Sequence, residues 1–177
     1  LDVRPIFRDT ESGVPKTGRG LDLAPHLKPE LVSLNLRGSD KESIIRELLG
    51  MVTTASLIKD PDAVLAALLA REASMSTGLE RGIAVPHCRT DSVTDLVCAV
   101  GLKPEGLDFG SLDGQPARIV VLTLSPAASP TPHVQFMSSM AQALTPAVCE
   151  HLLYADSPEA VIGLLTGQLK PESRLAA

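Results

Sequence analysis

The stretch that organises the chain is REASMSTGLERGIAVPHCR, residues 71–89. Its apolar run 83–85 stands between Gly82 and Pro86, and this pattern predicts a short buried strand that ends where His87 appears. An ionisable imidazole would then lie at the end of a sheet. Proline fixes its own φ and has no N–H donor, so Pro86 limits how the chain leaves the strand. The alternative is that His87 has no functional role, since most single histidines do not belong to a catalytic or binding site.

Outside this stretch, the spacing of apolar residues predicts further elements. A strand over residues 31–36 precedes two helices, the first opened by a Ser39-x-x-Glu42 capping box and the second by Asp60 before Pro61. Further strands are predicted over 83–85, 96–102 and 117–124. Three further helices are each opened by a capping residue followed by proline: Thr131-Pro132, Thr145-Pro146 and Ser157-Pro158. The predicted order is strand, two helices, three strands and three helices, without an internal repeat.

The composition favours one domain that binds small molecules or other proteins. Of 177 residues, 44% are hydrophobic but only 2% aromatic, so aliphatic side chains must fill the core. Few aromatics weaken the case for base stacking or sugar platforms. The net charge is −5 and the basic residues are scattered, which argues against nucleic acid or an anionic membrane surface as the main partner.

The chain divides into a domain and two short tails. Residues 1–20 mix arginines, acids, prolines and glycines without periodicity, which predicts a linker or flexible tail. The domain is expected over 21–170, and 171–177 form a C-terminal tail. No apolar run approaches the ~20 residues of a membrane helix, and no signal peptide opens the chain, so no membrane insertion is expected. The chain begins with Leu1 and not with methionine, which suggests a fragment of a longer protein.

The three cysteines indicate a cytoplasmic protein with reduced thiols. Cys88, Cys98 and Cys149 form no C-x-x-C pair, are odd in number and stand in apolar contexts. The His87-Cys88 pair alone is weak evidence for a metal site, because no further ligands have metal-site spacing. We expect neither a metal nor another cofactor.

A second histidine, His133, stands at a predicted helix start. With Thr131 as cap and Pro132 as first residue, His133 falls in the first turn, where free N–H groups attract anions and favour a neutral, donating imidazole. Arg71 lies near the end of the second helix. Together, His87, His133 and Arg71 could serve phosphoryl transfer through histidine without a metal. Spacing alone does not bring them together, and the alternatives are a surface histidine and a charge that caps a helix.

The motifs RE-x-x-x-STG-x-x-x-GIAVPH and EGLDFGSLDG, followed by a proline-rich loop into the helix of His133, resemble enzyme IIA of the phosphoenolpyruvate-dependent phosphotransferase system. The resemblance is to the fructose, mannitol and nitrogen-regulatory class and covers residues 21–169. It implies a three-layer α/β sandwich with a small mixed sheet flanked by helices. It also implies that His87 is the phosphorylated nucleophile, that His133 hydrogen-bonds the phosphoryl group or its acceptor ring, and that Arg71 stabilises charge.

The same resemblance implies the partners. The phosphoryl donor would be the small histidine phosphocarrier protein HPr or its nitrogen-branch relative, and the acceptor a IIB domain. Two departures stand near the nucleophile: Cys88 replaces a common glycine, and Glu80-Arg81 replace shorter or uncharged residues, which could alter which partner docks. We interpret Cys88 as a small apolar neighbour.

Two other functions stay open at this point. The domain would alternatively be a regulatory module that controls a transporter or sensor through its phosphorylation state. A zinc hydrolase that uses His87, Cys88 and His133 is a third possibility, but no carboxylate or further histidine has the required spacing.

Overall fold

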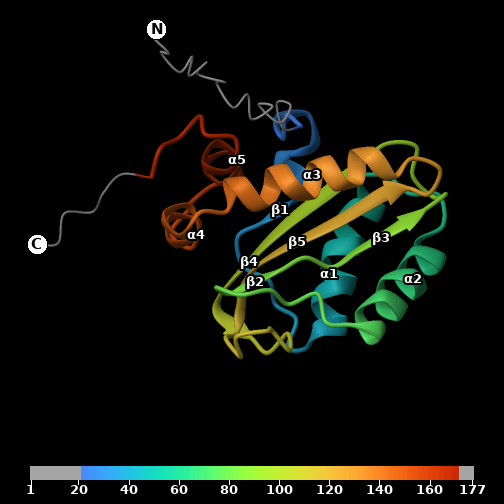
Figure 1. The fold of residues 1–177 in the computed structure, drawn as a ribbon, viewed down its shortest axis with the longest axis horizontal. Coiled ribbons are helices and arrows are strands. Elements are labelled where there is room, and N and C mark those ends of the chain that lie inside the picture. Colours follow the sequence, from blue (N-terminus) through green and yellow to red (C-terminus); the bar gives the residue numbers. More distant parts are fainter. Residues whose placement is uncertain (1–20, 172–177) are drawn as a thin grey trace, which may run out of the picture.

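The computed structural model describes residues 21–171, and its middle layer is a five-stranded mixed sheet (Figure 1). The strands are β1 (Val32–Ser33), β2 (Ile83–Ala84), β3 (His87–Thr90), β4 (Val97–Leu107) and β5 (Ala117–Pro126). β1 runs parallel to β4, and β4 runs antiparallel to β5. On the other side of β5, β2 and then β3 run parallel to it, one after the other along the same edge.

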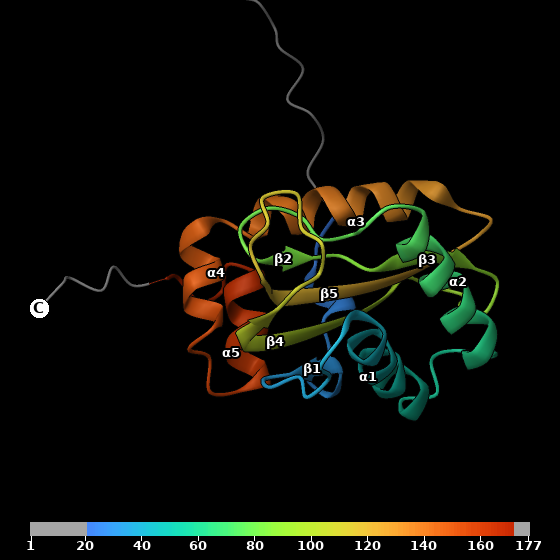
Figure 2. The same cartoon turned by 90° about the horizontal axis from the view of Figure 1, so that it is seen from below.

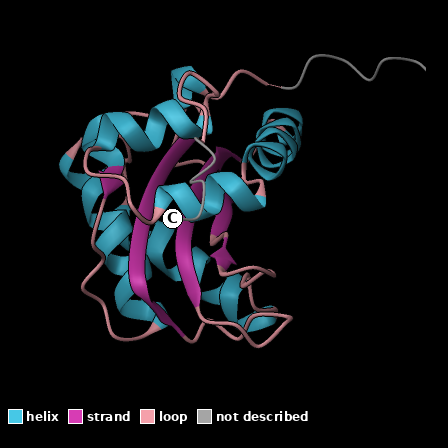
Figure 3. Ribbon diagram, turned by 90° about the vertical axis from the view of Figure 1, so that its left-hand side faces the viewer, coloured by secondary structure: helices cyan, strands magenta, loops and turns pink. Residues whose placement is uncertain are grey.

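Helices cover both faces of this sheet, as Figures 2 and 3 show. The helices are α1 (Lys41–Thr54), α2 (Pro61–Ser74), α3 (Pro130–Ala143), α4 (Pro146–Leu152) and α5 (Pro158–Leu165). One buried cluster joins the sheet to α1 and α2, and a second joins the opposite face to α3, α4 and α5. The implied three-layer sandwich is therefore confirmed. Its elements follow the predicted order with one difference: four strands, β2 to β5, lie between α2 and α3 where three were predicted.

The alternation of side chains along β5 explains how one strand serves two cores. Val120, Leu122 and Leu124 belong to the cluster with α1 and α2, whereas Ile119 and Val121 belong to the cluster with α3 to α5. Successive side chains of a strand point to opposite faces, so a continuous apolar run is required when both faces are covered. Each such side chain contributes about 1.5–3 kcal/mol on burial.

Two predicted helix starts were wrong by one or two residues. Asp40, and not Ser39, caps α1: its carboxylate accepts from the Ser43 N–H and the Ser43 hydroxyl accepts from the Asp40 N–H. For α3, the cap is Ser129 and not Thr131, and the helix begins at Pro130. Prolines are accommodated in the first turn because those N–H groups have no helical partner. The predicted caps of α2, α4 and α5 are confirmed.

Two predicted strands also differ from the structure. The strand expected over 31–36 is reduced to β1, because Pro29 begins a 3₁₀ turn that ends at Leu31. The strand predicted over 83–85 is β2, but His87, which was expected to lie just past its end, begins a further strand, β3. Pro86 interrupts the edge because it lacks an N–H, but its carbonyl accepts from the Thr123 N–H at 3.0 Å and keeps the chain beside β5.

The predicted N-terminal tail, 1–20, and most of the predicted C-terminal tail, 172–177, lie outside the described residues. Within the described part of the chain, no helix is long and apolar enough to cross a membrane.

Candidate active site

Arg71, His87 and His133 line one open hollow of about 580 Å³, together with Arg89, Ala127 and Val134. We call it the histidine hollow. It forms where the C-terminal turn of α2, the start of β3 and the N-terminal turn of α3 meet. The two imidazole rings lie 5.3 Å apart between centroids, with 40° between their planes. Residues that sequence spacing could not bring together thus share one site.

The His87 ring has one nitrogen tied to the backbone. Its Nδ1 lies 2.7 Å from the Val85 carbonyl oxygen. A carbonyl can only accept a hydrogen bond, so Nδ1 must carry the proton. The neutral ring is therefore the Nδ1–H tautomer, with its lone pair on Nε2. One nitrogen is oriented and the other is available as a nucleophile.

The carbonyl that orients His87 is itself braced by a buried carboxylate. The Val85 N–H donates to the Thr77 carbonyl, while the Thr77 N–H and hydroxyl both donate to Oε2 of Glu72. Oε1 of Glu72 pairs with Lys41 Nζ at 3.0 Å, and the Glu72 side chain is 8% exposed. Burial acts to raise the pKa of Glu72, but the hydrogen bonds from Thr77 and Lys41 outweigh it and the pKa lies below its usual value.

Glu72 and Thr77 belong to the RE and STG motifs, and residue spacing alone did not reveal what they do. The structure shows a brace between α1, α2 and the turn that leads into β2, and this brace holds the N–H of Val85, the residue whose carbonyl orients His87. Residue spacing carried no specific signal for this brace, because local bonds from side chain to backbone join residues up to four apart and Glu72 bonds Thr77, five residues on.

His133 is the fourth residue of α3, and its Nδ1 lies 2.8 Å from the hydroxyl oxygen of Ser125 on β5. Partial burial lowers the pKa of His133 from 6.5, and the charges of His87 and Arg89 lower it further. The lowered pKa favours the neutral form of the His133 ring. A neutral ring can donate one hydrogen bond without adding a full positive charge.

Two arginines supply positive charge to the histidine hollow. Arg71 lies in the last turn of α2, where its Nη1 donates to the Met75 carbonyl at 2.8 Å, so it caps the helix end as well as lining the hollow. Arg89, which sequence analysis missed, lies two residues after His87 on β3 and is exposed. The available signal was the period of a strand, which places residues i and i+2 on one face.

Cys88 borders the hollow, but its side chain packs away from the histidines. It is 7% exposed and belongs to the cluster with α1 and α2. Burial raises the pKa of its thiol to about 11, so the nucleophilic thiolate is scarce at neutral pH. Cys98 and Cys149 are also free and buried. Among residues 21–171, no three His, Cys, Asp or Glu side chains gather as metal ligands.

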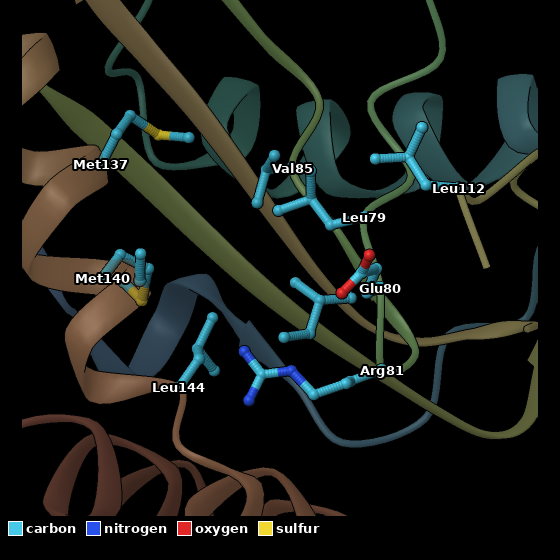
Figure 4. A pocket seen from close by; sticks show the side chains of 10 residues that line it. Leu79, Glu80, Arg81, Val85, Leu112, Met137, Met140 and Leu144 are labelled. Atoms are coloured by element: carbon cyan, nitrogen blue, oxygen red, sulfur yellow. The ribbon is translucent and has the colours of Figure 1, made fainter.

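A second hollow, of about 270 Å³, lies farther along α3 and differs in chemistry (Figure 4). Its lining is mainly apolar, from Leu79, Ile83, Val85, Met137, Met140 and Leu144. The charged residues in its lining are Glu80 and Arg81, the pair that differs from the shorter or uncharged residues of the resembling family. Neither a histidine nor a cysteine lines it, so the groups suited to phosphoryl chemistry belong to the histidine hollow.

Comparison with known proteins now assigns the family. Residues 25–167 match the family described as "Phosphoenolpyruvate-dependent sugar phosphotransferase system, EIIA 2". The chain belongs to this family. An EIIA relative, the "PTS system fructose-specific EIIA component" of Haloferax volcanii, is 38% identical over 137 residues, which cover 77% of this chain and 89% of the relative.

Solved EIIA structures share the fold. The nitrogen regulatory protein IIA-Ntr of Neisseria meningitidis superposes with a TM-score of 0.76 at 25% identity, over 81% of this chain and 98% of that one. Enzyme IIA for mannitol from Escherichia coli, solved in complex with phosphorylated enzyme IIB, gives a TM-score of 0.69 at 29% identity, over 80% and 97%. The EIIA fold and family are thereby established.

Proposed function

We propose that this EIIA domain carries a phosphoryl group on Nε2 of His87, taken from an HPr-type protein and passed to a IIB acceptor. The observation that supports this most strongly is the pairing of the rings. Nδ1 of His87 is held by a carbonyl, and Nε2 has no hydrogen-bond partner among residues 21–171. The ring of His133, whose pKa is lowered, lies 5.3 Å away between ring centroids.

In the first transfer, the Nε2 lone pair of His87 attacks phosphorus. The P–N bond to the donor histidine breaks, the new P–N bond forms, and the donor nitrogen recovers its electron pair. The His87 ring gains positive charge while Nδ1 keeps its proton, and the Val85 carbonyl stabilises that charge through its hydrogen bond. Arg71, Arg89 and the His133 ring meet the charge on the transferring oxygens.

In the second transfer, the phosphoryl group leaves His87 for the acceptor. A cysteine thiolate of the IIB partner attacks phosphorus, and the electron pair of the P–N bond returns to Nε2. The exposed Val134, at 64%, and the exposed Arg89 flank the hollow and offer apolar and charged contacts to such a partner. The complex of mannitol enzyme IIA with phosphorylated IIB supports a partner of this class.

The second candidate is a regulatory module, supported by the similarity to IIA-Ntr. Phosphorylation would add a charge of about −1.5 to −2 at the histidine hollow, enough to make or break a docking contact. In this case the phosphoryl group would stay on the domain, and the partner would read its presence.

The test is incubation with phosphoenolpyruvate, enzyme I and HPr. We expect one acid-labile phosphoryl group per chain and none in His87→Ala. Label that persists in His87→Ala would overturn the assignment of the nucleophile. A chase with a IIB domain then separates the candidates, because a carrier loses its label to the IIB cysteine and a regulatory module retains it.

A further inference from the structure

Ser125, the penultimate residue of β5, lies beneath the ring of His133. Its side chain is fully buried, at 0% exposure, and its hydroxyl oxygen is 2.8 Å from Nδ1 of His133. It is paired in register with Arg89, two residues after the pair between Thr123 and His87. Ser125 therefore lies on the face of the sheet that carries both rings, and it contacts one of them directly.

The direction of this hydrogen bond follows from hydrogen-bond satisfaction. His133 is the partner of the Ser125 hydroxyl within the described residues, and buried hydroxyl protons are rarely left without an acceptor. If the imidazole donated, the serine proton would have no acceptor there. Satisfaction therefore favours the hydroxyl as the donor to the Nδ1 lone pair, an arrangement that leaves the proton of the neutral His133 ring on Nε2.

We propose that Ser125 is a positioning residue that fixes His133 as its Nε2–H tautomer. The inference rests on the proposed function, and deepens it by naming the group that makes His133 a donor. An Nε2–H group can donate to the oxygens of a phosphoryl group on His87. The opposite tautomer would turn an Nε2 lone pair towards those oxygens, and two acceptors repel each other.

The chain provides a matched control on the same strand. Thr123 is also fully buried, two residues before Ser125, and its hydroxyl has no hydrogen-bond partner among the residues that the structure describes. Thr123→Val removes that hydroxyl and keeps the shape of the side chain. Ser125→Ala removes a hydroxyl that holds the His133 ring. The two variants therefore delete the same chemical group from neighbouring buried positions.

The experiment is ¹⁵N NMR of histidine-labelled protein, first unphosphorylated and then phosphorylated. We expect an Nε2–H tautomer for His133 in the wild-type protein and in Thr123→Val, and a mixture of tautomers or the Nδ1–H form in Ser125→Ala. The phosphoryl transfer rate should fall about tenfold in Ser125→Ala, as for the loss of one hydrogen bond to a charged group. Ser125→Thr, which keeps a hydroxyl, should restore the tautomer and most of the rate.

An unchanged His133 tautomer in Ser125→Ala would overturn the proposal, as would an equal change in Thr123→Val. If Ser125→Ala fails to fold, Ser125→Cys repeats the measurement with a side chain of similar size and a weaker donor, and the same two results decide. The tautomer is measured before phosphorylation. A protein that is never phosphorylated would refute the proposed function and leave the tautomer result readable by itself.

Discussion

The two histidines of the site are held in different ways. His87 is oriented by a main-chain carbonyl, that of Val85, whereas His133 is oriented by a single side chain, Ser125. A carbonyl cannot be removed by substitution, so the geometry of His87 depends on the path of the whole turn that precedes it. The geometry of His133 depends on one hydroxyl. The proposed nucleophile is therefore held by the fold, and the proposed donor ring is open to adjustment by single substitutions.

The largest expected effect is on the brace behind His87. Glu72→Ala should lower the free energy of unfolding by about 2 kcal/mol, because it leaves the Thr77 donors and Lys41 without their partner. Phosphorylation of His87 should fall as well, since the Val85 carbonyl is no longer fixed. Chemical denaturation and the labelling rate measure the two effects.

The matched control is Glu42→Ala, which removes an i,i+4 pair with Arg46 whose side chains are both 54% exposed. Exposed helix pairs contribute about 0.5 kcal/mol or less. Equal losses in the two variants would show that Glu72 is an ordinary surface charge.

The second effect concerns the donor ring itself. His133→Ala should leave the label on His87 but slow transfer about 10- to 100-fold, because one donor to the phosphoryl oxygens is lost while the nucleophile stays in place. Quench-flow labelling of wild type and variant measures the rates. Complete loss of label would contradict the division of roles, since it would make His133 necessary for attack.

The third effect is a pH dependence of stability that belongs to His133. The pKa of His133 is lowered in the folded protein. Below the ordinary pKa of 6.5, the ring therefore binds a proton more readily in the unfolded chain than in the folded protein, and this difference favours unfolding. The contribution of this group is complete above pH 6.5 and is lost as the pH falls through the lowered pKa. Unfolding free energies measured across this range should fall more steeply for wild type than for His133→Gln. Parallel curves would contradict the lowered pKa.

The smallest effect is expected at Cys88, which follows the proposed nucleophile, His87, in the sequence. Its side chain packs on the opposite face, so Cys88→Ala should leave phosphorylation unchanged and cost about 1 kcal/mol of stability. The raised pKa of the thiol predicts slow alkylation by iodoacetamide in the folded protein at pH 7. A loss of phosphorylation in this variant would show that Cys88 shapes the histidine hollow.

Sequence analysis predicted the elements that rest on local chemistry. The apolar face of α1 and the cap-then-proline starts of α2, α4 and α5 follow from contacts within a few residues, and all are confirmed. Between adjacent candidates such as Ser39 and Asp40, local patterns do not decide, because both side chains can cap. Here Ser43 decides, by accepting from the Asp40 N–H.

The site itself was predictable only in part. His87, His133 and Arg71 were identified as candidates, yet their meeting depends on three elements packing at one edge of the sheet, which no local pattern specifies. Ser125 looks like an ordinary serine near a strand end, and only the position of α3 gives it a partner. The spacing of residues in the sequence does not predict a side chain that acts by orienting another side chain.

The most direct test of the central claim is the position of the phosphoryl group within the phosphorylated protein, measured by ³¹P and ¹⁵N NMR. With Nδ1 of His87 bonded to the Val85 carbonyl at 2.7 Å, we predict phosphorus on Nε2 of His87 and an intact Nδ1–H. Phosphorus on Nδ1 of His87, or on His133, would contradict the account.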